Sequence, residues 1–160
     1  MNQDQVRAVK LAVACLKQLT IIPGETENDV ANKIFVFLKH HHSRPAFRTI
    51  VGSGKRTAIP HCFPTNKVIR KGELVMVDFG AVWNGWRSDL TRTFVMGKPT
   101  AKQRKIIGIV RNAQRQAIKA VQPGLTINKI DKIARDYIAA HGYRKYFIHS
   151  TGHGIGRRVH

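Results

Sequence analysis

The residues best suited to chemistry are two acids and three imidazoles: Asp78, Asp89, His61, His153 and His160. Carboxylates and imidazoles together suit divalent Mn, Fe, Co or Zn better than thiolate-seeking ions. A pair of such metals can share a water molecule, lower its pKa and stabilise the oxygens of a hydrolytic transition state. Two aspartates and one histidine are few ligands for two ions, so we expect further carboxylates to take part.

Asp78 and Asp89 lie on a predicted pair of strands. Asp78 ends the apolar run 75–77, Asn84-Gly85 is a strong hairpin signal, and residues 91–95 alternate as a strand does. A carboxylate at the end of an apolar strand is costly unless a cation or hydrogen-bond donors meet it. We therefore expect the two aspartates to face each other across the hairpin and hold metal. Taken singly, Asp78 could instead be a turn former, and Asp89 could be an exposed hairpin residue.

The histidines are weaker signals individually. His153 lies between Gly152 and Gly154, which let backbone and metal approach closely, although a loop histidine is the alternative. His61 and His160, alone, read as ordinary polar residues, and only the combination makes them candidates. Cys62, beside His61, lacks the context of a nucleophile and is interpreted as structural.

Four amphipathic helices are predicted to frame these residues, over about 4–19, 27–39, 101–121 and 127–140. Thr26 and Thr126 are expected to cap the second and fourth. Residues 47–61 predict a strand, a glycine-rich turn and a second extended piece. That turn, Gly52-Ser53-Gly54, lacks the longer pattern of a phosphate-binding loop.

An internal repeat links the two halves of the chain. Pro23-Gly24 and Pro123-Gly124 lie 100 positions apart, each between two predicted helices, and the same offset carries Gly52 onto Gly152. We interpret this as a duplicated helix–helix–strand unit, with residues 1–97 as the first copy and 101–160 as a partial second copy. The second copy stops at His160 with no hairpin to mirror the first, which predicts that its C-terminal strands are missing.

Composition sets broader bounds. The 160 residues suffice for one domain, and 28 Lys plus Arg against 9 acids give a formal charge of +19. Such a charge favours nucleic acid or anionic surfaces, but the basic residues are dispersed and no nucleic-acid motif accompanies them. A solvated basic surface, or a fragment without its acidic remainder, is the alternative. Without a long apolar run, a signal peptide or a cysteine framework, a cytoplasmic protein is expected.

Four motifs resemble those of the pita-bread metallopeptidases, and especially of the Xaa-Pro aminopeptidase and Xaa-Pro dipeptidase branch. They are Ile-Pro-His-x-x-Pro-Thr at 59–65, Val-Asp-Phe-Gly-Ala at 77–81, Gly-Trp-Arg-Ser-Asp-Leu-Thr-Arg-Thr at 85–93 and Thr-Gly-His-Gly-Ile-Gly-x-x-Val-His at 151–160. Methionine aminopeptidase shares the fold and the Gly-His-Gly-Ile-Gly block. Trp86 and Arg87 depart from the usual pattern but leave Asp89 in place.

The resemblance implies an α/β (α+β) pita-bread fold with internal duplication. It implies that Asp78 binds one metal, Asp89 bridges two, and His153 binds the other. His61 and His160 would contact substrate and stabilise the tetrahedral intermediate as metal-bound hydroxide attacks. The implied cofactor is a pair of divalent ions, manganese first, with cobalt, zinc or iron as alternatives.

The implied reaction removes the first residue from peptides with proline second. The expected partner is a peptide substrate, with a homodimer as an option, nucleic acid bound only nonspecifically through basic charge, and no membrane. The family's two glutamate ligands lie beyond its second histidine, and its N-terminal domain has no counterpart here. We therefore expect this chain alone to be catalytically incompetent, with little or no turnover. The rival interpretation is a catalytically dead pita-bread module that binds protein or nucleic acid.

Overall fold

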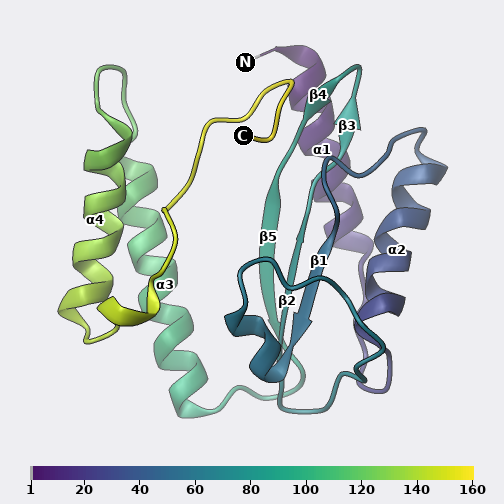
Figure 1. The fold of residues 1–160 in the computed structure, drawn as a ribbon, viewed down its shortest axis with the longest axis horizontal. Helices are drawn as coiled ribbons and strands as arrows, with labels where there is room; N and C mark the ends of the chain where they lie inside the picture. Colours follow the sequence, from purple (N-terminus) through teal and green to yellow (C-terminus); the bar gives the residue numbers. More distant parts are fainter. Residues whose placement is uncertain (1) are drawn as a thin grey trace. The chain divides into compact units, whose positions relative to one another are not determined.

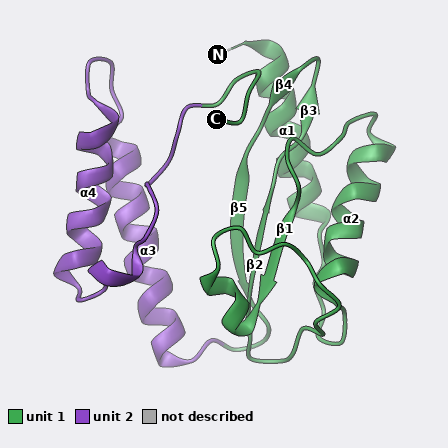
Figure 2. Cartoon of the chain, viewed as in Figure 1, with its two compact units in different colours: residues 1–98, 155–160 green, residues 99–154 purple. Residues whose placement is uncertain are grey.

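The computed structural model describes residues 2–160, which form two compact units (Figure 1). Figure 2 shows unit 1, which runs to Lys98 and includes Ile155–His160, and unit 2, which is Pro99–Gly154. Among these residues, no helix combines the length and apolar character needed to cross a bilayer.

Unit 1 is a small antiparallel sheet with two helices. In chain order its elements are α1 (Gln3–Gln18), α2 (Glu27–His40), β1 (Ile50–Ser53), the 3-10 helix η1 (Gly54–Ala58), β2 (Leu74–Phe79), β3 (Val82–Trp83), β4 (Trp86–Arg87) and β5 (Leu90–Val95). The main sheet has the order β1-β2-β5, and β3 and β4 form a separate two-stranded ribbon. β2 is therefore the central strand.

The core of unit 1 lies between α1, α2 and one face of this sheet. Val30 and Ile34 of α2 are fully buried against Val75, Val77 and Phe79 of β2. Because side chains alternate along a strand, the residues between these valines and Phe79 point to the other face. Asp78 is one of them, and it is only partly buried. Hydrophobic packing of β2 on the helices thus holds this carboxylate on the opposite face.

The predicted helices of unit 1 are confirmed to within two residues. α2 begins with a capping box in which the Thr26 hydroxyl accepts from the Asp29 amide and the Asp29 carboxylate accepts from the Thr26 amide. Such reciprocal caps satisfy amides that have no partner within the helix. The predicted hairpin also forms, with Asn84 and Gly85 at φ 46° and 80°, the left-handed values that a tight two-residue turn requires.

Two local expectations for residues 47–61 and the hairpin differ from the structure. The second extended piece of 47–61 is the 3-10 helix η1, in which the Thr57 hydroxyl bonds back to the Gly54 carbonyl. The hairpin is interrupted between β2 and β3, because Ser88 bonds to the backbone of Ala81 and diverts the chain. Local hydrogen bonds therefore replace the longer ladder that the pattern predicts.

Unit 2 is a helical hairpin, α3 (Ala101–Ala120) and α4 (Ile127–Ala140), followed by the 3-10 helix η2 (Arg144–Tyr146). Ile109, Ala113 and Ala117 of α3 pack against Ala134 and Ile138 of α4. The strand expected after α4 does not form in the described residues. A strand needs a neighbour for its ladder, and unit 2 has no other strand among its described residues.

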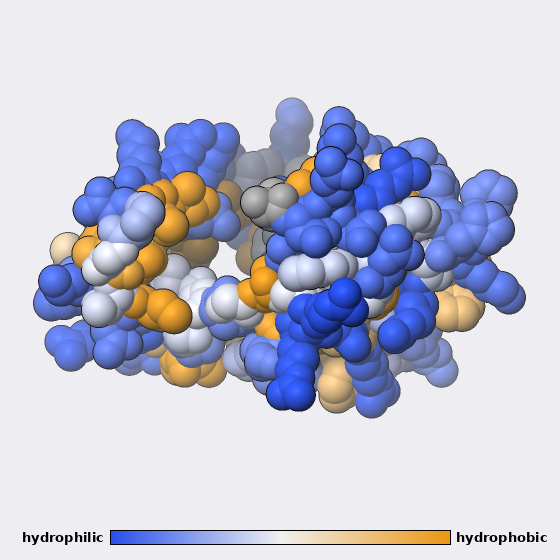
Figure 3. Space-filling view, turned by 90° about the horizontal axis from the view of Figure 1, so that it is seen from above, coloured by the Kyte–Doolittle hydropathy of each residue, from blue (hydrophilic) through white to orange (hydrophobic). Residues whose placement is uncertain are grey.

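Hydrophilic side chains cover much of the face seen in Figure 3. The orange side chains on its left belong to unit 2, whose exposed apolar residues include Ile118, Val121 and Ile127. Polar and charged residues occupy most of the remaining visible surface.

Candidate metal centre

Asp78 and Asp89 come together through the register of β2 and β5. Asp78 is paired with Thr91, and the ladder ends with the pair Phe79 and Leu90. Asp89 therefore lies just outside the ladder, directly before Leu90. The carboxyl groups of Asp78 and Asp89 interact through a hydrogen bond as well as through charge, and the Thr91 hydroxyl bonds to Asp78. The predicted meeting of the two aspartates is confirmed, while their role as ligands stays a prediction.

The electrostatics of this pair favour a cation. Burial, and after it the negative charge of Asp89, raise the pKa of Asp78 to about 6. The Thr91 hydrogen bond and the charge of His61 act in the opposite direction on the same pKa. Oδ1 of Asp78 is buried with no hydrogen-bond partner in residues 2–160. A divalent ion would satisfy this oxygen and neutralise the like charges, so the donor set fits a hard or borderline metal.

A glycine makes the close approach of the two aspartates possible. A Cβ placed on Gly80 would lie 1.7 Å from the carbonyl oxygen of Ser88, far inside van der Waals contact. The Ser88 hydroxyl accepts from the Ala81 amide at 2.9 Å, and the Ser88 amide donates to the Ala81 carbonyl at 3.0 Å. At this crossing point Gly80 lies two residues after Asp78, and Ser88 directly precedes Asp89.

His61 is exposed on the loop that follows η1, and its charge acts on Asp78. The Cys62 carbonyl accepts from the Val51 amide at 3.2 Å, which ties the loop to β1. Cys62 itself is buried and unpaired with Cys15, in agreement with a structural role. Its burial also raises the pKa of its thiol, which disfavours the reactive thiolate.

Glu27 is a functional candidate that sequence reasoning missed. Its carboxylate is fully buried and accepts from the amide and hydroxyl of Ser53, at 2.8 and 2.9 Å. It also accepts from the amide and hydroxyl of Thr65, at 3.1 and 2.8 Å, and from Arg56 Nε at 3.1 Å. These bonds connect the start of α2 with both sides of the loop that carries His61. An acid in the first turn of a helix has an ordinary explanation in the helix dipole, which concealed this role.

The Ser53 bonds also settle the weak phosphate-loop interpretation. The amide and hydroxyl that a phosphate would need are both given to the carboxylate of Glu27. A second carboxylate, that of Glu73, lies 2.5 Å from the position a Cβ would take on Gly54. The groups of this turn are therefore already bound to carboxylates, which argues against a phosphate there.

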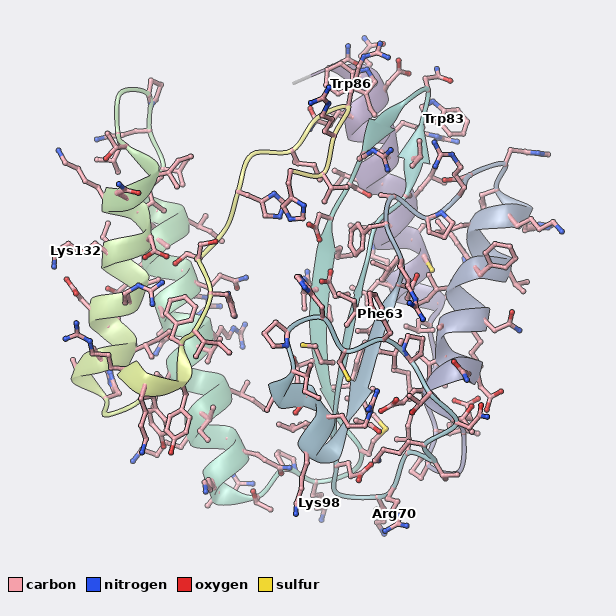
Figure 4. All side chains as sticks on the ribbon, in the orientation of Figure 1. Phe63, Arg70, Trp83, Trp86, Lys98 and Lys132 are labelled. Carbon is pink, nitrogen blue, oxygen red and sulfur yellow. The ribbon has the colours of Figure 1, made fainter. Side chains whose placement is uncertain are left out.

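The last residues of the chain are attached to the β3–β4 ribbon. The Arg87 amide donates to the Gly156 carbonyl at 2.9 Å, and Arg87 Nε donates to the Arg157 carbonyl at 3.0 Å. Arg157 also lies over the ring of Trp86, 5.4 Å from its centroid, and Figure 4 labels Trp86 at this ribbon. His160, which is exposed, follows this attachment and belongs to unit 1.

His153 belongs to unit 2 and is exposed between its two glycines. Its Nδ1 contacts the carbonyl oxygen of Gly154 at 2.8 Å. In residues 2–160, no group of three or more His, Cys, Asp or Glu side chains is arranged to hold a metal ion. The structure therefore brings Asp78 and Asp89 together, while the parts of His61, His153 and His160 in the site stay predictions.

Comparison with known proteins assigns the family. Residues 5–160 match metallopeptidase family M24. The chain belongs to this family. It is 44% identical over 154 residues to the Xaa-Pro dipeptidase of Pyrococcus furiosus, a match that covers 96% of this chain and 44% of that protein. The chain spans less than half the length of this curated M24 peptidase.

Solved M24 structures confirm the fold. An Xaa-Pro dipeptidase from Bacillus anthracis superposes with a TM-score of 0.96 at 39% identity, covering 99% of this chain and 45% of that one. An X-Pro aminopeptidase from Thermotoga maritima gives a TM-score of 0.95 at 33% identity, with the same coverage. The mixed α/β pita-bread fold expected from the four motifs is therefore correct for this M24 chain.

Proposed function

We propose that the chain is part of a metal-dependent exopeptidase that removes the first residue from peptides with proline in the second position. The observation that carries the proposal is the contact between Asp78 and Asp89, with one carboxylate oxygen buried and unpartnered. The names of the similar proteins, Xaa-Pro dipeptidase and X-Pro aminopeptidase, support proline as the second residue.

The proposed metal ligands are Asp78, Asp89 and His153, with Asp89 bridging two divalent ions, manganese first among them. When bound, such ions lower the pKa of water and stabilise negative charge on the substrate oxygen. This chain's own part is to hold Asp78 on β2 and Asp89 directly before β5, its neighbour in the sheet. The other face of β2 packs against α1 and α2. This packing fixes the position of Asp78 from the side of the sheet that does not carry its carboxylate.

His61 and His160 are proposed to bind the peptide. His61 is exposed, its charge acts on Asp78, and its loop is anchored by Glu27 through Thr65. An imidazole there can donate a hydrogen bond to the carbonyl oxygen of the scissile bond, where charge develops during hydrolysis. The anchored loop keeps this donor in place before substrate arrives.

We also propose that the 160-residue chain, assayed by itself, has little or no turnover. Its described residues bring two carboxylates together, and a pair of ions needs a larger ligand set to bind tightly. A cytoplasmic location is part of the proposal, supported by two buried cysteines that are both free.

A non-catalytic binding module is the second candidate, and the charge of +19 is the observation that favours it. α3 carries six Lys or Arg residues and no acid, and all six are exposed: Lys102, Arg104, Lys105, Arg111, Arg115 and Lys119. Sequence-specific nucleic-acid binding would discriminate between targets, whereas simple attraction would only weaken steeply with salt.

The test uses the natural protein that contains this chain, purified with Mn²⁺. It is assayed on an Xaa-Pro dipeptide, an Xaa-Pro tripeptide and matched peptides with alanine second. Proline-dependent release that Asp89→Ala abolishes and the surface variant Asp136→Asn leaves intact is the expected result. Dipeptide against tripeptide separates a dipeptidase from an aminopeptidase. Absence of hydrolysis, together with sequence-selective nucleic-acid binding, would favour the binding module instead.

A further inference from the structure

The segment that leads to His153 is held by one ion pair on α4. Asp131 Oδ1 accepts from the Thr151 amide at 2.8 Å and from the Thr151 hydroxyl at 2.9 Å. Arg135 donates to the Phe147 and His149 carbonyls, both at 2.9 Å. These four bonds span residues 147–151, so both ends of the approach to His153 are fixed to the same helix.

The pair itself is rigid. Asp131 and Arg135 are one turn apart on α4, and Arg135 Nε and Nη2 donate to the two oxygens of Asp131 at 2.8 and 3.2 Å. The guanidinium also lies over the Phe147 ring, 4.5 Å from its centroid. A two-pronged arginine–carboxylate contact fixes orientation as well as distance, which a single long side chain cannot do.

The segment needs such a device because its own backbone gives it little definition. It forms no strand, and His153 is flanked by glycines at which a Cβ would meet nothing within 4 Å. Glycine loses more conformational freedom on ordering than any other residue. The bonds to Thr151, two residues before His153, are the ones nearest to the imidazole on this side.

The same chemistry occurs in unit 1, around His61. There the carboxylate of Glu27 accepts from the amide and hydroxyl of Thr65, and Arg56 binds Glu27 and donates to the Phe63 carbonyl at 2.8 Å. In both units an arginine–carboxylate pair clasps a threonine amide and hydroxyl and a phenylalanine carbonyl close to a histidine. Its presence in both units argues against an incidental surface ion pair.

We propose that Asp131 and Arg135 are positioning residues, which act through Thr151 to hold the His153 segment in the conformation that binds metal. This inference rests on the proposed function, since that function makes His153 a ligand. Neither Asp131 nor Arg135 touches the reacting groups. Their effect passes through the backbone of residues 147–151.

The test is carried out on the metal-free 160-residue chain, so that it does not depend on activity. Asp131→Asn is compared with Asp136→Asn, which removes the other ion pair of the same spacing on α4, the exposed Lys132–Asp136 pair. Figure 4 shows Lys132 projecting away from α4. Hydrogen exchange of the Thr151 amide and the imidazole resonances of His153 are measured, with His141 as the internal reference.

Asp131→Asn is expected to speed exchange of the Thr151 amide, which donates to the Asp131 carboxylate, by about tenfold, and to shift or broaden the His153 signals, because it weakens charge-assisted bonds. In Asp131→Asn, amide exchange in α3 and the His141 signals are expected to match those of the parent chain. In Asp136→Asn, every measured exchange rate and imidazole signal is expected to match the parent chain. Two further variants cover the case that Asp131→Asn does not fold. Thr151→Val is expected to change the His153 signals partway toward those of Asp131→Asn, and Thr151→Ser is expected to leave them as in the parent chain.

Two results would overturn the proposal. One is a His153 spectrum and exchange pattern in Asp131→Asn that equal those of Asp136→Asn. The other is global unfolding by Asp131→Asn together with an unchanged His153 in Thr151→Val. If exchange changes as expected but His153→Ala retains full peptidase activity in the natural protein, the proposed function fails while the positioning effect stands.

Discussion

Replacement of Asp78 by asparagine is expected to stabilise the metal-free chain near neutral pH. The parent residue carries a charge that is partly buried, next to a second carboxylate, with one oxygen unpartnered. The asparagine side chain would remove the charge, keep the shape, and offer an amide that can donate to the carboxylate of Asp89. The site would then be more stable and less able to bind a cation.

The magnitude follows from the pKa. Burial and the neighbouring charge raise the pKa of Asp78 from 3.8 to about 6, a rise of roughly two units at about 1.4 kcal/mol each, or about 3 kcal/mol at most. Because Asp78 is only partly buried and Asp89 is exposed, solvent screening reduces this to about 1–2 kcal/mol. A raised folded-state pKa makes this loss of stability grow as pH rises from 3.8 through about 6.

Denaturant unfolding of the parent and Asp78→Asn chains, in chelator, measures this effect. The gain in unfolding free energy is expected to be about 1–2 kcal/mol near pH 7.5 and below about 0.5 kcal/mol near pH 4, where the parent carboxyl is protonated. Thr91→Val, which removes a hydroxyl that stabilises the charged form, is expected to act oppositely. A destabilising Asp78→Asn near pH 7.5, or a gain independent of pH, would refute the reasoning.

Three further outcomes are expected. Gly80→Ala should cost about 2–4 kcal/mol in unfolding experiments, because its Cβ would overlap the Ser88 carbonyl, whereas Gly108→Ala, in open space on α3, should not destabilise. Glu27→Gln should lower the free energy of unfolding by about 3–5 kcal/mol, since the buried donors and Arg56 lose the negatively charged carboxylate that they bind. An unchanged unfolding midpoint would contradict this. The pKa of Asp131 is lowered to about 2 by Arg135 and Thr151, so its stabilising contribution, present above pH 3.8, should fade as pH drops toward 2. Protection of the Thr151 amide, measured relative to its intrinsic exchange rate, should fall in the same range, and equal protection above pH 3.8 and near pH 2 would count against this.

Much of the fold could be predicted because local patterns decide it. Apolar spacing defined the four helices, and Asn84-Gly85 defined the turn of the ribbon, since few residue pairs adopt two consecutive positive φ values. The prediction of an extended piece after Gly54 was wrong, because the pattern of apolar residues does not report the hydrogen bonds to Glu27 and within η1. The strand expected in the second copy of the repeat did not form after α4, because a strand depends on a neighbour, and periodicity reports only the chain's own pattern.

The candidate site was recoverable only in part. Asp78 and Asp89 stood out because charge is rare at the end of an apolar strand, and the register of β2 and β5 brings them together. Glu27 and Asp131 did not stand out, because acids near the start of a helix, or one turn from an arginine, already have local explanations. Their partners lie 20 or more residues away, at Thr65 and Thr151, and only the folded chain reveals them.

Titration of the chain with Mn²⁺, followed by the loss of the free-ion paramagnetic resonance signal, tests the central claim that the two aspartates form a cation site. The parent chain is expected to bind Mn²⁺, and Asp89→Asn to bind at least about tenfold more weakly, which corresponds to roughly 1.4 kcal/mol. Asp136→Asn, an acid removed elsewhere on the surface, is expected to bind as the parent does. Equal affinity in the parent and Asp89→Asn chains would contradict the account.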